Sequence, residues 1–285
     1  MAQVKYDIFT YQLSPITTNQ QDLFREIKSA DEIMANKNGR FYEVFHDDIS
    51  FFHRRFKLTY QVEYHTKDVI IIRLANKKKV AIEKGFHRAV FDSEPSSVII
   101  IYNNEDYQYM VIESDRTSFG TSFTVMRILY NALSRELAKY NLQIKIHPKY
   151  EEKAFWDLVD QYSEQIEALK FEYEYPNLAR VNQTLIEDLK LASKELSSSK
   201  TKLEFDATKT HVLTNLTEDN KQLTNMVKAS ASGAGPIKIK LKTHRNWEST
   251  ENKVSSLHFD ELTVDLPGDS KQEFVEAIID KLKNQ

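Results

Sequence analysis

The sequence ASASGAGPIKIKLKTHRNW, residues 229 to 247, joins a helical segment to an alternating one through Gly233 and Gly235. Glycine loops that bind phosphate follow a strand and begin a helix, so that free helix N–H groups point at the anion. Here the order is reversed, and glycine is the usual residue just after a helix ends. We therefore predict a helix end and a turn, and not a phosphate loop.

The alternation in PIKIKLK indicates a strand with two different faces. Residues two apart in a strand share a face, so Lys238, Lys240 and Lys242 point the same way. Arg245 and Trp247 follow, with no acidic residue between 236 and 247. This pattern is typical of the solvated face of an edge strand, where lysines oppose aggregation. It also fits a strip that contacts phosphates, with Trp247 as a stacking surface.

Similar alternation recurs through the second half of the chain, where helical and strand-like segments follow one another about every 30 residues. Such strands predict a sheet that helices cover on one side only. The first half is richer in strands, among them SSVIIIYNNEDYQYMVIES (96 to 114), in which Asn103 to Asp106 can turn a hairpin. We expect an α+β protein with a β-rich domain over residues 1–140 and an αβ domain over 141–285.

Composition excludes several classes of site. The chain has 285 residues and no cysteine, which rules out disulfides, thiolate zinc sites and thiol catalysis. Its apolar runs are strand-sized, far below the ~20 residues of a membrane span, and the N-terminal segment does not resemble a signal peptide. We expect a cytoplasmic protein without membrane insertion. The net charge of −3 predicts no general affinity for polyanions.

Charge is nevertheless segregated along the chain. Residues 53–90 carry ten basic and three acidic side chains, 10 − 3 = +7, whereas residues 151–175 carry two and eight, 2 − 8 = −6. Clustered basic residues are typical of a polyanion-binding surface. The charges can also pair with each other or with a second copy. The side chains that we predict to contact nucleic acid are Arg54, Arg55, Lys57, Lys77, Lys78, Lys79, Lys238, Lys240, Lys242 and Arg245.

The segment HDDISFFHRRFK, residues 46 to 57, is the candidate for chemistry. It concentrates His46, His53 and two aspartates, residue types that bind metal or transfer protons. A metal site needs further carboxylates that the sequence does not identify, so a polar turn beside a basic surface is favoured. No Walker loop, Gly-x-Ser-x-Gly, Gly-x-Gly-x-x-Gly or His-Glu-x-x-His motif occurs. We expect neither a cofactor nor a metal ion. The sequence favours a binding protein over an enzyme.

One stretch resembles a known set of proteins. In SVIIIYNNEDYQYMVIESDRTSF, LQIKIHPKY and ALKFEYEYPNL, with the helices between them, the order of elements is similar to that of bacterial and phage anti-phage proteins. These include the B subunit of the Kiwa defence system and the Rex A exclusion protein of phage lambda. The resemblance covers about residues 95–245. It implies DNA binding, a homodimer and a role in phage resistance, and it transfers no functional residue.

The leading hypothesis is therefore a non-catalytic protein of antiviral defence that binds nucleic acid, DNA rather than RNA, without sequence specificity. Phosphate contacts give affinity and salt dependence but little sequence preference. Two alternatives stay open. One is a nuclease-type toxin of an abortive-infection system that uses the His46 to Arg55 cluster. The other is a scaffold subunit that binds a partner protein of a defence operon.

Overall fold

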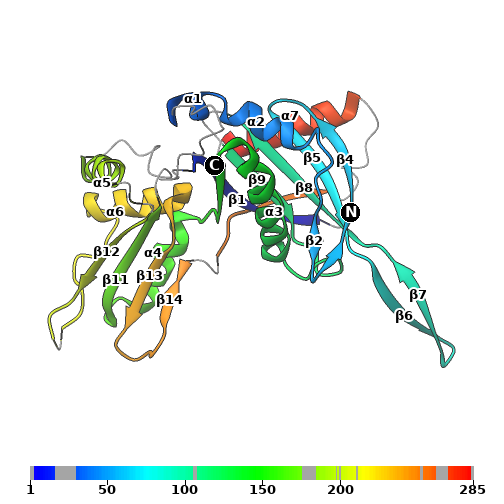
Figure 1. Cartoon of the computed structure of the whole chain (residues 1–285). Coiled ribbons are helices and arrows are strands. Elements are labelled where there is room, and N and C mark those ends of the chain that lie inside the picture. The colour runs from blue at the N-terminus through cyan, green and yellow to red at the C-terminus, as the bar shows by residue number, and fades with distance from the viewer. Residues whose placement is uncertain are drawn as a thin grey trace. The chain divides into compact units, whose positions relative to one another are not determined.

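The computed structural model describes residues 3–16, 30–104, 108–174, 184–196, 198, 200–209, 211–250, 253–260 and 269–283. The chain divides into two units, one of residues 1–146 with 256–285 and one of residues 147–255. Both combine helices and antiparallel sheets, so the predicted α+β class is confirmed (Figure 1). Among the described residues, no helix is both long and apolar enough to cross a bilayer.

The first unit is built on a seven-stranded sheet. Its strand order is β10-β1-β9-β8-β5-β4, and β15 also pairs with β1. The strands are β1 (Gln3–Pro15), β4 (Thr59–His65), β5 (Val69–Ala75), β8 (Ser96–Asn103), β9 (Gln108–Glu113), β10 (Leu142–Pro148) and β15 (Ser256–Asp260). The pairing of the predicted hairpin is confirmed, because β8 and β9 run antiparallel from Ile99 opposite Ile112 to Asn103 opposite Gln108. Residues 105 and 106 of the predicted turn lie outside the described residues.

Both faces of this sheet are buried, which explains its unbroken apolar runs. Along β5, Ile70 and Ile72 lie in one core and Val69 and Ile71 in another. The first core also receives α2 (Lys37–Val44) and α3 (Ser122–Leu137), whereas the second receives α7 (Asp269–Lys283). A short helix, α1 (Ala30–Ala35), contacts β1. The sheet is thus enclosed between helices, and strand alternation sorts its side chains into two cores.

The last part of the chain belongs to this first unit. β15 pairs antiparallel with β1, with Tyr6 opposite Leu257. Phe259 then packs edge-on against Phe274 of α7, with 5.5 Å between ring centroids. The sequence predicts one domain for all residues after 140. In the structure the units divide at residue 146 and again at residue 255. The reason is that the apolar face of β15 and α7 is buried only on the first sheet.

Two small antiparallel ribbons also belong to the first unit. One joins β2 (Phe52–His53) to β3 (Phe56–Lys57), and the other joins β6 (Lys78–Lys84) to β7 (His87–Ser93). The β6–β7 ribbon extends away from the seven-stranded sheet (Figure 1). Every side chain from Lys79 to Asp92 is exposed.

The second unit has a four-stranded sheet in the order β12-β11-β13-β14. The strands are β11 (Ile166–Glu174), β12 (Lys200–Asp206), β13 (Ile237–Leu241) and β14 (Trp247–Ser249), and the helices are α4 (Glu152–Tyr162), α5 (Thr184–Glu195) and α6 (Lys221–Ala229). Phe155 and Val159 of α4 and Met226 of α6 share one core with Phe171 and Ile239 of the sheet. The opposite face carries charged side chains, so the sheet is covered on one side as predicted.

The segment 229–247 folds as its residue order predicts. α6 ends at Ala229, one wider turn runs to Ala234 with Gly233 at φ 97°, and β13 begins at Ile237. Gly235 has φ 148° and lies against the backbone of β11. A Cβ built there would be 1.8 Å from the carbonyl oxygen of Glu172. The second glycine is therefore needed for close approach between a turn and a strand.

Candidate nucleic-acid interface

The β2–β3 hairpin carries two arginines in an uncommon backbone conformation. Arg54 and Arg55 form its two-residue turn with φ 46° and 74°. Such turns need positive φ at both central residues, which is why Asn-Gly usually occupies them. Arginine at these positions costs backbone energy, and residues held this way cluster at functional sites. Both guanidinium groups are exposed.

Beside this turn lies a pocket of about 340 Å³, here named the basic pocket. Its size is within the usual range for small-ligand sites. Its lining residues come from the hairpin, from the loop before α3 and from the first turns of α3: Phe52, His53, Arg54, Phe119, Thr124, Arg127, Ile128 and Asn131. None of these side chains is acidic, and three are basic or can become so. The pocket therefore suits an anion.

The pKa of His53 reflects the positive charge around the basic pocket. Burial lowers the pKa of His53, and the nearby charges of Arg54, Lys78 and Arg127 lower it further. The imidazole is consequently neutral near pH 7. An anion in the pocket would oppose those cations and favour the protonated ring. The same three cations that suppress the charge on His53 are thus available to attract a phosphate.

The walls of the basic pocket are fixed by contacts outside it. Arg135 donates from Nη2 to the carbonyl oxygen of Ser50 at 2.7 Å and lies 5.8 Å from the ring centre of Phe52. On the other side, the ring of His53 meets that of Phe119 edge-on at 5.9 Å. Phe52 remains 46 % exposed. An apolar ring at the rim of a cationic pocket can stack on a sugar or base beside a bound phosphate.

The remaining basic residues predicted in the first unit adjoin this site or point away from it. Lys57 is exposed at the end of β3. Lys78, at the base of the β6–β7 ribbon, donates to the carbonyl oxygen of Thr117 at 2.7 Å and lowers the pKa of His53. Lys77 pairs with Glu94 at 3.6 Å, and Lys79 lies opposite Asp92. Lys77 and Lys79 thus have acidic neighbours, whereas Lys78 adds to the field of the pocket.

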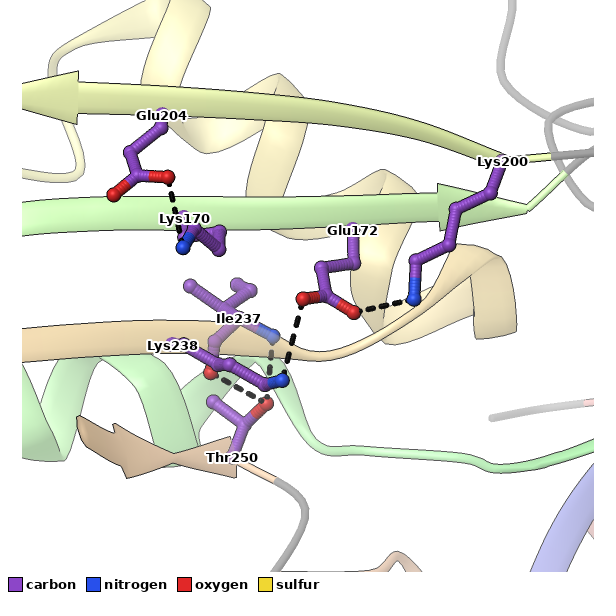
Figure 2. A network of polar contacts seen from close by, with 7 residues as sticks. All are labelled: Lys170, Glu172, Lys200, Glu204, Ile237, Lys238 and Thr250. Carbon is purple, nitrogen blue, oxygen red and sulfur yellow. Dashed lines mark hydrogen bonds and ion pairs between the residues drawn. The ribbon is translucent and has the colours of Figure 1, made fainter. Parts of the chain in front are cut away.

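The predicted lysine strip of the second unit is largely paired within the sheet. β13 lies between β11 and β14, so the edge-strand interpretation is wrong. Figure 2 shows the ammonium groups of Lys238 and Lys200 meeting the two oxygens of Glu172, at 3.2 and 2.5 Å. Burial alone raises the pKa of Glu172, but the hydrogen bonds and charges of these lysines outweigh it and lower the pKa.

Neighbouring side chains extend this charged network. Lys240 donates to the carbonyl oxygens of His244 and Arg245 at 2.9 and 2.7 Å, which folds the β13–β14 turn over its ammonium group. Lys170 pairs with Glu204 at 2.8 Å and lies 4.5 Å from the ring centre of Trp247. The Trp247 ring, predicted as a stacking surface, thus already contacts a cation. Lys242 and Arg245 are exposed in the turn after β13.

The histidines of the segment 46 to 57 lie in different surroundings. The ring of His46 contacts those of Tyr42 and His65, with centroids 4.6 and 4.4 Å apart. His53 instead contacts Phe119 in the basic pocket. No group of three potential metal ligands gathers anywhere in the described residues. These contacts therefore give no structural support to the nuclease alternative.

Sequence reasoning missed the α3 side of the basic pocket. Thr124, Arg127 and Asn131 lie three and four residues apart and so share the outer face of α3. The helical period by itself predicts that these three side chains share a face. Its proximity to the β2–β3 hairpin depends on the packing of α3 against the sheet, which no local pattern encodes.

Comparison with known proteins adds no further constraint, since neither a protein-family model nor a curated protein matches this chain.

Proposed function

We propose that the protein binds DNA without sequence specificity through the basic pocket and the exposed cations around it, and that it does so without catalysis. The observation that supports this most is the convergence of Arg54, Arg127 and His53 on one pocket that, among the described residues, no carboxylate lines. Guanidinium groups bind phosphate oxygens in a bidentate manner. Contacts of this kind position a duplex but read no bases.

The salt dependence of binding follows from the number of phosphates contacted. Arg54, Arg55, Lys57 and Arg127 offer four exposed cations on or beside the pocket. Four neutralised phosphates give a slope of about −3.6 in a plot of log affinity against log salt. The affinity then falls on the order of 100-fold between 50 and 200 mM salt.

Fluorescence anisotropy with a labelled duplex across a salt series tests the proposal. The double variant Arg54→Gln/Arg127→Gln should make the slope shallower by about 1.8, because two phosphate contacts are lost. Lys209→Gln removes an exposed positive charge in the second unit and is the matched control. An unchanged slope in the double variant, or binding that does not respond to salt, would refute the proposal.

The broader role rests on other grounds. The resemblance to anti-phage proteins supports a function in phage resistance as a homodimer, and the strand-sized apolar runs support a place in the cytoplasm. A phage plaque assay on cells that express the wild type or Arg54→Gln/Arg127→Gln tests the connection. Equal protection by both proteins would separate resistance from DNA binding. The nuclease and scaffold alternatives stay hypotheses, to be tested by His46→Ala/His53→Ala toxicity and by co-purification.

A further inference from the structure

The β6–β7 ribbon has two chemically different faces. Residues directly opposite each other in an antiparallel pair share a face, and successive pairs alternate. One face carries Lys79 opposite Asp92, Ala81 opposite Val90 and Glu83 opposite Arg88, so each acid has a basic partner. The other face, here named the ribbon groove face, carries the other four of the seven pairs: Lys78–Ser93, Val80–Phe91, Ile82–Ala89 and Lys84–His87.

The ribbon groove face combines apolar side chains with cations and has no acid. Val80, Ile82 and Phe91 are 41, 53 and 53 % exposed, although they form a continuous apolar stripe. Lys84 and His87 lie at its outer end and Lys78 at its inner end. A partner for this face must accept apolar contact along the middle and carry negative charge at both ends. The grooves of duplex DNA, lined by sugars and edged by phosphates, meet that requirement.

The tip of the ribbon holds an aromatic ring at an energetic cost. Gly85 and Phe86 form the turn with φ 59° and 63°. Phe86 is 98 % exposed, so no packing against the described part of the chain offsets its left-handed backbone. A turn of this type normally has Asn, Asp or Gly at such a position. A bulky ring kept at a strained and solvated tip indicates a contact that is made outside the chain.

The inner end of the ribbon joins the basic pocket. Lys78 opens the ribbon groove face and also lies close enough to His53 to lower its pKa. Cations therefore continue from the pocket onto the ribbon. A second copy of the chain fits this face less well. Face-to-face stacking of two ribbons would bring lysines together without a carboxylate on either side to compensate them.

We propose that the β6–β7 ribbon is a DNA-binding arm whose groove face enters a groove of duplex DNA and whose Phe86 ring wedges into a base step. The inference rests on the proposed function and adds the mode of binding. Seven residues per strand span about 20 Å, which corresponds to about six base pairs. Apolar wedges of this kind unstack the step and bend the duplex by about 20–90°.

The test uses a 20-base-pair duplex with a donor and an acceptor dye at its ends, and a second duplex that contains 2-aminopurine. Wild-type protein should shorten the end-to-end distance and raise the 2-aminopurine fluorescence. Phe86→Gly should abolish both signals and weaken binding about tenfold, while the salt slope is unchanged. Phe86→Leu should keep the bend, since leucine also serves as a wedge.

Phe86→Gly is informative because it relieves the positive φ, so the variant should be at least as stable as the wild type. Leu196→Ala removes an exposed apolar side chain in the second unit and should leave bending unchanged. Thermal unfolding of both variants provides the control for folding.

The possible negative results distinguish failure of the arm from failure of the proposed function. If Phe86→Gly bends and binds DNA as the wild type does, while Arg54→Gln/Arg127→Gln makes the salt slope shallower, the arm is refuted and the proposed function stands. If neither variant changes binding, both proposals fail. The arm is also refuted if Phe86→Gly leaves DNA binding intact but abolishes flotation with phosphatidylserine vesicles, or dissociates a dimer in sedimentation equilibrium.

Discussion

Replacement of Gly235 by alanine tests whether the close approach between the turn and β11 supports the second unit. The glycine has φ 148° and ψ 174°, a region that glycine alone occupies readily. An added Cβ would lie 1.8 Å from the carbonyl oxygen and 3.0 Å from the carbonyl carbon of Glu172. Both atoms belong to the backbone of β11, an interior strand of the sheet, so no side chain can rotate away.

The expected cost has two parts. Backbone strain in this region costs about 1–3 kcal/mol, and overpacking against neighbouring groups adds about 1–3 kcal/mol. Gly235→Ala should therefore lower the free energy of unfolding by roughly 2–6 kcal/mol. With a denaturant slope of about 2 kcal/mol per M, a loss of about 4 kcal/mol moves the urea midpoint by about 2 M.

Intrinsic fluorescence provides the assay. Both tryptophans of the chain, Trp156 and Trp247, lie in the second unit, so their emission follows the unfolding of that unit. The control is Gly39→Ala in α2, where nothing lies within 4 Å of an added Cβ. Alanine there should stabilise the helix by about 0.5–1 kcal/mol, as followed by circular dichroism.

The outcomes are distinct. A midpoint for Gly235→Ala within about 0.3 M of the wild type would contradict the reasoning, since the loss would then be below about 1 kcal/mol. It would mean that the turn after α6 moves away from β11 at little cost. A similar loss in Gly39→Ala would show that alanine acts through something other than the contact with Glu172.

Three further predictions concern buried or paired polar groups. Glu172→Gln should lower the free energy of unfolding by about 1–3 kcal/mol at pH 7. Because the pKa of Glu172 is lowered in the folded protein, the stabilisation by its carboxylate is present above the unfolded pKa of about 4.3 and is lost as pH falls through the folded pKa. The urea midpoints of variant and wild type should therefore converge in acid. DNA affinity should rise as pH falls through the depressed pKa of His53, because bound phosphate favours its protonated form. His53→Asn should reduce that pH dependence in anisotropy titrations, and an unchanged profile would contradict the assignment. Asn103→Ala should cost about 1–3 kcal/mol, because it removes the hydrogen bonds of the Asn103 side chain with the buried Tyr11 hydroxyl and with the carbonyl oxygen of Asn38. Hydrogen exchange of β8 measures the loss, and unchanged protection there would argue against the network.

Local patterns predicted most of the secondary structure. The strands β10 to β13 and the helices α3 to α6 follow segments whose apolar residues recur with period 2 or 3.6. The path of the chain between units was not predictable in this way. β15 reads as an ordinary alternating strand, and only its pairing with β1 places it in the first unit.

The candidate site, too, was predictable from the sequence only in part. Arg54, Arg55 and Lys78 were identified because basic residues crowd the segment 53–90. The contribution of α3 to the pocket was missed. Conversely, Lys238 looked available in the sequence, yet Glu172 of β11, 66 positions away, neutralises it. Charge along a chain says which side chains are cationic, but pairing between distant strands decides which cations remain open to a partner.

The sequence by itself therefore determined the α+β class, the helix end and turn at Gly233 to Pro236, and the cation-rich composition of the N-terminal half. The tertiary structure decided the rest. It placed Arg127 opposite the β2–β3 hairpin, paired Lys238 with an acid, and left Phe86 solvated at the end of a ribbon. The physical reason is range. Propensity and periodicity act over a few residues, whereas pockets, ion pairs and exposed faces depend on which distant elements pack together.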